Sequence, residues 1–209
     1  MRSLRIVLLG PPGSGKGTQA RLIASKQGLS HLSTGDILRD EVKKGSKLGG
    51  EAEGYMNQGA LVPDELIIEM IRGRIAGLDG FILDGFPRTL SQAEALAEIT
   101  QLQLVINIVL PRAEVIKRLT ARRVCRNCGR IYNILFDPPE DPTRCPACGG
   151  ELFQRDDDRA EVIENRYDVY KKETAVLIDF YRDRGLLQQV DGRQSVSDAN
   201  AEITALIER

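Results

Sequence analysis

Residues 10–18 read Gly-Pro-Pro-Gly-Ser-Gly-Lys-Gly-Thr, and this stretch decides the fold. It lies between an apolar run at 4–9 and a helix predicted over 16–26, with Gly10 followed after four residues by Gly15 and Lys16. Glycines in this spacing let successive backbone N–H groups turn inwards around phosphate oxygens, and the helix N-terminus adds its positive dipole end. The amine of Lys16 supplies a mobile positive charge. The stretch therefore predicts a triphosphate-binding loop rather than a glycine-rich turn without a ligand.

The residue after Lys16 departs from the general pattern of such loops. That position usually carries Ser or Thr, whose hydroxyl holds Mg²⁺. Here it is Gly17, and Thr18 follows. Because Gly17 offers no hydroxyl, we expect phosphates and water to hold most of the Mg²⁺ coordination sphere. The form Gly-x-Gly-Lys-Gly-Thr is similar to that of nucleoside monophosphate kinases.

Apolar strands and helical patterns alternate along the whole chain. Strands are predicted over 4–9, 29–33, 81–83, 104–110 and 186–190, and helices over 16–26, 63–75, 91–99, 113–123, 159–184 and 197–207, with short helices within 36–56. Ser91 is expected to be the N-cap of its helix. This alternation predicts a three-layer α/β/α fold around a five-stranded parallel sheet. The single histidine, His31, falls on the second strand and is interpreted as structural.

Five further segments resemble the adenylate kinase family. They are Ser33-Thr34-Gly35-Asp36 with Arg39, Phe81-Ile82-Leu83-Asp84-Gly85-Phe86-Pro87-Arg88 with Gln92, Arg122-Arg123, Arg155-Asp156-Asp157-Asp158 with Arg166, and Val190-Asp191-Gly192. With the phosphate loop they extend from the first strand to the last, so the resemblance covers the chain. It implies reversible phosphoryl transfer from Mg-ATP to AMP, giving two ADP. It also implies a core (1–32, 63–121 and 160–209), a helical AMP-binding insert (33–62) and a small zinc-ribbon-like lid (122–159).

The resemblance assigns roles to residues at the motif positions. Expected in catalysis are Lys16, Asp84, Arg88, Arg122, Arg155 and Arg166. Expected to bind ATP are Gly13, Ser14, Gly15, Lys16, Gly17, Thr18, Arg118, Arg122, Ile131, Tyr132 and Gln194. Expected to bind AMP are Thr34, Arg39, Ala60, Leu61, Val62, Gly85, Phe86, Pro87, Arg88, Gln92, Arg155 and Arg166. Arg118 is the member of these sets that would pack on the ATP adenine.

Physical chemistry gives several of these roles a reason. Asp84 ends an apolar strand beside the phosphate loop, where a carboxylate can orient Mg²⁺ through water. The guanidinium of Arg88 can pair with a phosphate through two hydrogen bonds, and the amide of Gln92 can both donate to and accept from an adenine edge. ATP and AMP together carry about six negative charges, which the arginines would balance.

No general base is needed, because the acceptor is a phosphate oxygen that is already ionised at neutral pH. Transfer to water is the competing reaction, so the site must close, and the two inserts at 33–62 and 122–159 are the segments expected to move.

The cysteines form two pairs separated by 16 residues, Cys125-x-x-Cys128 and Cys145-x-x-Cys148. This spacing is typical of a four-cysteine zinc site, and four protein ligands leave no open position, so the expected zinc is structural. Four free cysteines, or an iron–sulfur cluster, are the weaker alternatives. The apolar residues 131–136 between the pairs are expected to form a small hairpin over the metal.

Composition limits the remaining function classes. The formal net charge of -1 gives no bulk attraction to nucleic acid or membrane surfaces, and no apolar run approaches the about 20 residues of a membrane span. We expect a cytoplasmic monomer. The alternatives are a kinase for another nucleoside monophosphate, a GTPase, and a nucleotide-dependent zinc-ribbon protein that binds nucleic acid. A GTPase is disfavoured because the sequence lacks the guanine-reading motif Asn-Lys-x-Asp.

Overall fold

Strand β1 (Arg5–Leu9) is apolar from Ile6 onwards because both faces of the strand are buried. In the computed structural model, which describes residues 4–136 and 138–208, Val7 and Leu9 pack into one core cluster and Ile6 and Leu8 into another. Successive side chains of a strand point to opposite faces, so these two clusters are the two interfaces between the sheet and its helices.

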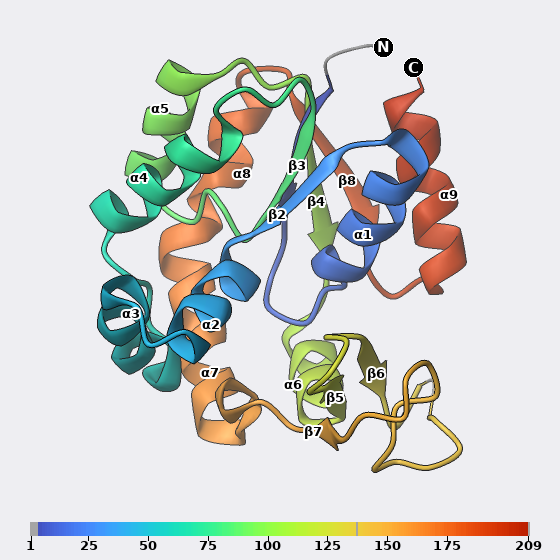
Figure 1. Cartoon of the computed structure of the whole chain (residues 1–209). Helices are drawn as coiled ribbons and strands as arrows, with labels where there is room; N and C mark the ends of the chain where they lie inside the picture. Colours follow the sequence, from blue (N-terminus) through green and yellow to red (C-terminus); the bar gives the residue numbers. More distant parts are fainter. Residues whose placement is uncertain (1–3, 137, 209) are drawn as a thin grey trace.

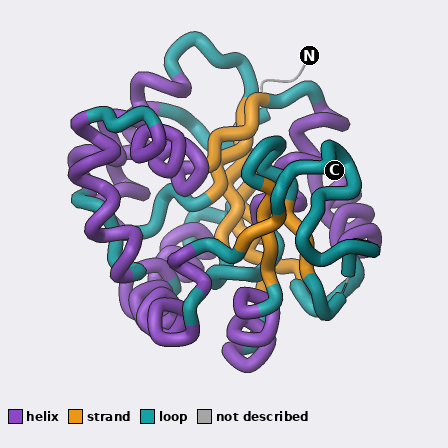
Figure 2. The backbone as a smooth tube through the Cα atoms, turned by 60° about the horizontal axis from the view of Figure 1, so that its bottom comes forward, coloured by secondary structure: helices purple, strands orange, loops and turns teal. Residues whose placement is uncertain are grey.

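The central sheet contains five strands that are parallel at every junction, in the order β2-β3-β1-β4-β8. The other strands are β2 (Ser30–Ser33), β3 (Phe81–Asp84), β4 (Leu104–Val109) and β8 (Leu187–Asp191). One face is covered by α1 (Lys16–Gln27) and α9 (Val196–Ile207), and the other by α4 (Asp64–Ile75), α5 (Leu90–Ile99) and α8 (Val176–Arg182) (Figures 1 and 2). The predicted three-layer fold with a five-stranded parallel sheet is therefore confirmed.

Two groups of elements extend from the carboxyl ends of the strands. The first contains α2 (Thr34–Lys43) and α3 (Lys47–Gln58), as predicted for 36–56. The second follows α6 (Arg112–Thr120) and is a three-stranded antiparallel sheet of β5 (Arg122–Cys125), β6 (Ile131–Asn133) and β7 (Leu152–Phe153). Both groups lie below the central sheet in Figure 1. None of the described helices combines the length and apolar content that a membrane crossing requires.

Two local sequence-based predictions are wrong for identifiable reasons. The helix predicted over 113–123 ends at Thr120, because residues 122–124 pair with 131–133 as strands; residues 131–136 therefore do not form a hairpin by themselves. The helical stretch predicted over 159–184 is present as α7 (Ala160–Val169), a π-helical segment (Tyr170–Thr174) and α8. The N-cap of α5 is Thr89 rather than Ser91, because the Thr89 hydroxyl reaches the N–H of Gln92 at 3.2 Å.

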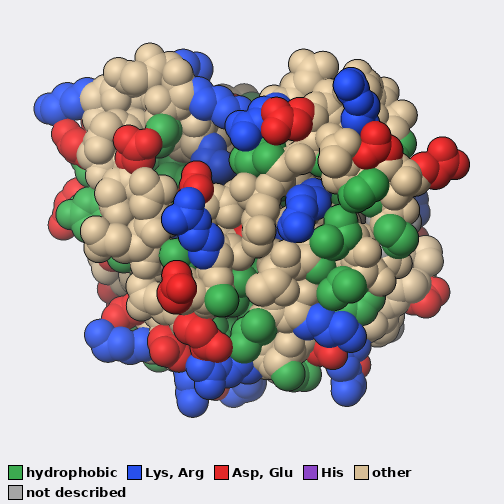
Figure 3. Space-filling view, turned by 90° about the horizontal axis from the view of Figure 1, so that it is seen from below, with side chains coloured by type: hydrophobic (Ala, Val, Ile, Leu, Met, Phe, Trp, Pro, Cys, Tyr) green, Lys and Arg blue, Asp and Glu red, His purple; other side chains and the backbone are tan. Residues whose placement is uncertain are grey.

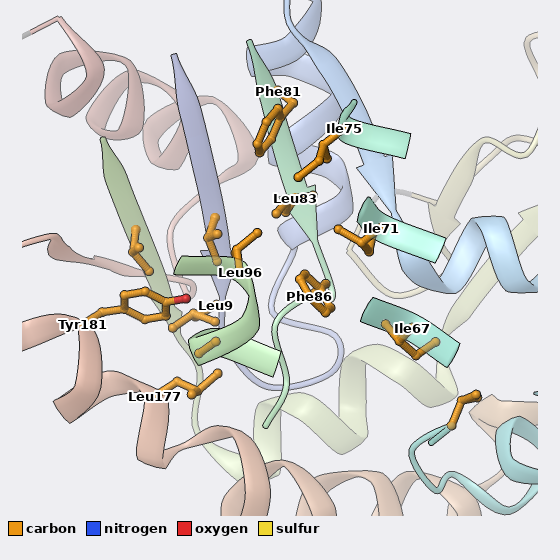
Figure 4. Close-up of a cluster of buried hydrophobic side chains, with 14 of the residues drawn as sticks. Leu9, Ile67, Ile71, Ile75, Phe81, Leu83, Phe86, Leu96, Leu177 and Tyr181 are labelled. Atoms are coloured by element: carbon orange, nitrogen blue, oxygen red, sulfur yellow. The ribbon is translucent and has the colours of Figure 1, made fainter. Parts of the chain in front are cut away.

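Phe86 belongs to the core between the sheet, α4 and α5. Its side chain is fully buried and points among Ile67, Ile71 and Leu96 (Figure 4). It follows Gly85 directly at the end of β3, so its burial anchors the segment that carries Arg88. The resemblance predicted that Phe86 binds AMP; its side chain lies in this core, and a contact between Phe86 and AMP stays a prediction.

Candidate active site and metal centre

A cleft of about 1390 Å³ opens at the carboxyl ends of β1 and β3, between the two groups of elements that extend from the sheet. Parallel sheets carry ligands at this end of their strands. Apart from Phe86, every residue predicted to bind nucleotide or take part in catalysis lines this cleft. Residues from β1, α2, β3, β5 and α7 thus meet in one cavity, although they are up to about 160 positions apart in sequence.

The phosphate loop wraps closely around its own lysine. The Lys16 ammonium donates to the carbonyl oxygens of Gly10 and Pro11, both at 2.8 Å. Gly10 has a φ of 140°, and a Cβ there would lie 2.5 Å from the carbonyl oxygen of Ile108, so a side chain does not fit. Burial lowers the pKa of Lys16 to about 8, against the opposing effect of the Asp84 carboxylate. The loop therefore presents a desolvated cation that an anion would stabilise.

Asp84 ends β3 on the floor of the cleft, where its carboxylate faces the loop. A Cβ at Gly17 would lie 3.1 Å from Asp84 Oδ2, so the missing side chain leaves room beside the carboxylate. His31 Nε2 lies 3.6 Å from the same oxygen. Burial acts to raise the pKa of Asp84, but His31 and Lys16 together hold it below its ordinary value. The structure places the imidazole of His31, which was interpreted as structural, beside Asp84.

Arg88 is held over the cleft by the turn that follows β3. Its Nε donates to the carbonyl oxygen of Gly85 at 2.7 Å, and the hydroxyl of Thr34 donates to the same oxygen at 2.8 Å. Gly85 has a φ of 79°, and a Cβ there would lie 2.8 Å from both side chains. Burial, and then the neighbouring Arg166, lower the pKa of Arg88 to about 10. The guanidinium is thus fixed in place, with its remaining donors available.

Asp36, at the start of α2, gathers three arginines from different parts of the fold. Its Oδ1 accepts from Arg39 at 2.6 Å and lies 3.5 Å from Nη2 of Arg155, while its Oδ2 lies 3.5 Å from Nη2 of Arg21. Arg21 and Asp36 were assigned no role from sequence. The pairing with Arg155 spans 119 positions, so nothing in the local sequence indicated it.

These contacts make Asp36 a pH-dependent source of stability. Burial acts to raise its pKa, but the charge and hydrogen bond of Arg39 outweigh that effect and lower the pKa to about 2, from 3.8. A carboxyl whose pKa is lowered by folding stabilises the protein above its unfolded pKa and loses this effect as the pH falls through its folded pKa. Asp36→Asn should therefore lower Tm at pH 6, and its difference from the unsubstituted chain should shrink between about pH 4 and pH 2.

Thermal unfolding at pH 6 and pH 3 measures this difference. Asp40→Asn is the matched control, because Asp40 is exposed on the same helix. A difference for Asp36→Asn that stays constant over this range, or that Asp40→Asn reproduces, would contradict the role given to Asp36.

Two further carboxylates, those of Asp157 and Asp158, hold Arg122 and Arg166. Asp158 is fully buried and accepts two hydrogen bonds from Arg122, at 2.6 and 2.7 Å. It also accepts from Arg166 Nη1 at 3.2 Å, and Asp157 Oδ2 lies 3.1 Å from the same nitrogen. Figure 3 shows acidic side chains beside the basic ones over this face of the molecule. The run 156–158 sits next to Arg155 in the sequence, which could have indicated carboxylates that orient the arginines.

Two ends of the cleft carry the residues that were predicted to bind the nucleotide bases. At the predicted ATP end, Arg118 and Lys117 lie over the ring of Phe136, at 5.8 and 5.0 Å from its centroid, and Phe136 was not predicted. Gln194 also lines this end and donates to Glu202 at 2.7 Å. At the predicted AMP end, residues 60–62 line the cleft together with the buried amide of Gln92.

The four cysteine sulfurs form one cluster in the small sheet. All lie within 4.8 Å of one another, with Cys125 Sγ 3.5 Å from Cys148 Sγ and Cys128 Sγ 3.7 Å from Cys145 Sγ. A tetrahedral zinc with Zn–S bonds of about 2.3 Å requires sulfurs about 3.8 Å apart. A Cβ at Gly150 would lie 2.9 Å from Cys125 Sγ, so the chain passes tightly around the sulfurs. The cluster could therefore hold zinc, as the spacing predicted.

Removal of that metal should destabilise the chain. The small sheet has short strands and a small apolar cluster, so four metal–thiolate bonds would supply much of its stability. We expect one zinc per chain in freshly purified protein, and a fall in Tm of about 10 °C or more after chelation. Metal analysis and calorimetry measure these quantities, with re-addition of zinc as the control. Zinc-free protein with an unchanged Tm would contradict the expectation.

Comparison with known proteins shows which family has a similar sequence. The sequence pattern of the family described as "Adenylate kinase" matches residues 8–186. The adenylate kinase of Archaeoglobus fulgidus is 49% identical to this chain, covering 99% of it and 99% of the relative. That of Carboxydothermus hydrogenoformans is also 49% identical, over 99% and 100% of the two chains. That of Methanothrix thermoacetophila is 48% identical, over 99% of each.

Proposed function

This chain belongs to the adenylate kinase family and is an ATP:AMP phosphotransferase, and on that premise we propose how its own residues bind the two nucleotides and close over them. The observation that carries the proposal is the convergence of Lys16, Arg88, Arg122, Arg155 and Arg166 on one cleft. Their positive charges suit the phosphates of a donor and an acceptor that must approach each other.

The proposed chemistry is positioning and charge stabilisation. Asp84 would orient a Mg²⁺ ion that arrives with ATP, through water in the room that Gly17 leaves, and the ion would supply positive charge to the transferred phosphate. Lys16 exchanges its two carbonyl partners for the outer phosphates of ATP. Arg88 directs its free donors to the phosphate of AMP, whose oxygen attacks in line. The two products are both ADP, so the same groups serve the reverse reaction.

Closure of the site is a further part of the proposal. It includes a division of the chain into a core (1–32, 63–121 and 160–209), an AMP-binding insert (33–62) and a lid (122–159), and residues from all three segments line the cleft, which supports it. Arg155 of the lid and Arg39 of the insert share Asp36, so phosphates that replace Asp36 would draw both parts inwards.

Fluorescent labels at Glu53 of the insert and Arg144 of the lid, both exposed, should approach each other when a bisubstrate analogue binds. An unchanged distance would contradict closure.

The choice of acceptor is tested with Mg-ATP and each of AMP, GMP, CMP and UMP. We expect kcat/KM to be highest for AMP, because Gln92 lies at the predicted base site and can both donate and accept. If kcat/KM were higher for another monophosphate, that monophosphate would replace AMP as the proposed acceptor. Retention on DNA at physiological salt would instead favour the nucleic-acid-binding alternative.

We also infer that the chain works as a cytoplasmic monomer with a resident structural zinc. For a monomer, light scattering should give a mass near 23.1 kDa. The four unbridged cysteines are typical of a reducing compartment, which supports the cytoplasm.

A further inference from the structure

Asp64, the first residue of α4, is tied to the side chain at the predicted base site. Its Oδ1 accepts from Gln92 Nε2 and its Oδ2 from the hydroxyl of Thr89, both at 2.6 Å. Thr89 Oγ1 also accepts from the N–H of Gln92, as the N-cap of α5. Asp64 itself does not line the nucleotide cleft; it borders a separate cavity of about 490 Å³ behind it. Asp64 can therefore act on a nucleotide through Gln92.

The two ends of the Gln92 amide face partners of opposite character. An ionised carboxylate only accepts hydrogen bonds, so Asp64 requires the NH₂ end of the amide. The backbone N–H of Arg88 only donates, and it donates to Gln92 Oε1 at 2.8 Å. Gln92 is 2% exposed, so water does not compete for these positions. The orientation of the amide is thus fixed from both ends.

The fixed amide retains one N–H and one lone pair of Oε1, and both purines can be compared with this pattern. Adenine presents an exocyclic amine, which donates, beside a ring nitrogen that accepts. Guanine presents a carbonyl oxygen in place of the amine. The free lone pair of Oε1 attracts the amine and repels the carbonyl. Reading guanine would require the amide to turn over, which sets its oxygen against the Asp64 carboxylate and its NH₂ against the Arg88 N–H.

We propose that Asp64 is a positioning residue that sets the preference for adenine over guanine by fixing the amide of Gln92. The inference rests on the proposed function, in which Gln92 reads the base of AMP. An Asn at position 64 has nearly the same shape but can either accept or donate, so it no longer opposes the turned-over amide, and the Arg88 N–H alone still does. A Glu keeps the acceptor-only character.

The test is the ratio of kcat/KM for AMP to that for GMP. Asp64→Asn should lower this ratio about tenfold or more, through KM for the monophosphate and without change in KM for ATP. Asp64→Glu should keep most of the ratio. Glu65→Gln is the matched control, because Glu65 is the exposed acid in the same first turn of α4, and it should leave the ratio unchanged.

A ratio for Asp64→Asn equal to that of Glu65→Gln, or an equal loss in Asp64→Glu, would overturn the proposal. Circular dichroism verifies folding of each variant. If Asp64→Asn does not fold, Asp64→Ser is the second variant, and it should lower the ratio in the same direction. Calorimetry also gives the ratio of the dissociation constants for GMP and AMP, and this measurement needs no turnover. A wild-type chain that binds AMP in preference to GMP but forms no ADP would sink the proposed reaction and leave this inference standing.

Discussion

Replacing Lys16 with Met should lower kcat by on the order of 10³-fold while leaving the fold intact. The Lys16 ammonium is desolvated and donates to two loop carbonyls, so it is positioned to move onto the outer phosphates of ATP. Met fills a similar volume without the charge, so the charge that develops during transfer loses its nearest cation. Steady-state kinetics with Mg-ATP and AMP measure the loss, and circular dichroism verifies the fold.

Lys26→Met is the matched control for this result. Lys26 lies in the last turn of the same helix, α1, and its side chain is exposed. It should retain near-normal turnover. Near-normal turnover in Lys16→Met as well would remove the phosphate loop from the mechanism.

Replacing Arg88 with Lys should lower kcat/KM for AMP by on the order of 10²-fold. A guanidinium has five donors in a rigid plane; the hydrogen bond from Nε to Gly85 sets that plane and leaves the outer donors for a phosphate. Lysine keeps the positive charge but cannot make the anchoring bond and the paired phosphate contact together. The loss should therefore fall on AMP and leave KM for ATP nearly unchanged.

The matched control is Arg72→Lys, since Arg72 is exposed on α4. It should have no effect on either substrate. If Arg88→Lys kept a normal kcat/KM for AMP, a positive charge alone would be sufficient at position 88. The proposed contact of two guanidinium donors with the phosphate of AMP would then be wrong.

The parts of the fold that were predictable from sequence are those in which local pattern and tertiary structure agree. The apolar run of β1 is buried on both faces, so its composition identified a central parallel strand. Gly10 adopts a conformation that excludes a side chain, and the loop pattern reflects that requirement directly. The paired spacing of the cysteines likewise predicted four sulfurs close enough for one metal.

The parts that failed depend on partners that are distant in sequence. Residues 122–123 continue a helical pattern, yet they form a strand because residues 132–133 are available to pair with them. The same is true of the carboxylates. Asp36 and Asp158 contact the arginines of the cleft, but most of these arginines lie in other segments of the chain. Ser91 and Thr89 are both acceptable N-caps, and local preference could not choose between them.

Counting ADP tests the central claim most directly. The purified chain is incubated with Mg-ATP and AMP, and all three nucleotides are quantified by chromatography over time. The proposed function predicts two ADP for each AMP consumed, the reverse conversion of ADP into ATP and AMP, and both reactions slowed by on the order of 10³-fold in Lys16→Met. An AMP concentration that stays constant, with ATP lost only to hydrolysis, would contradict it.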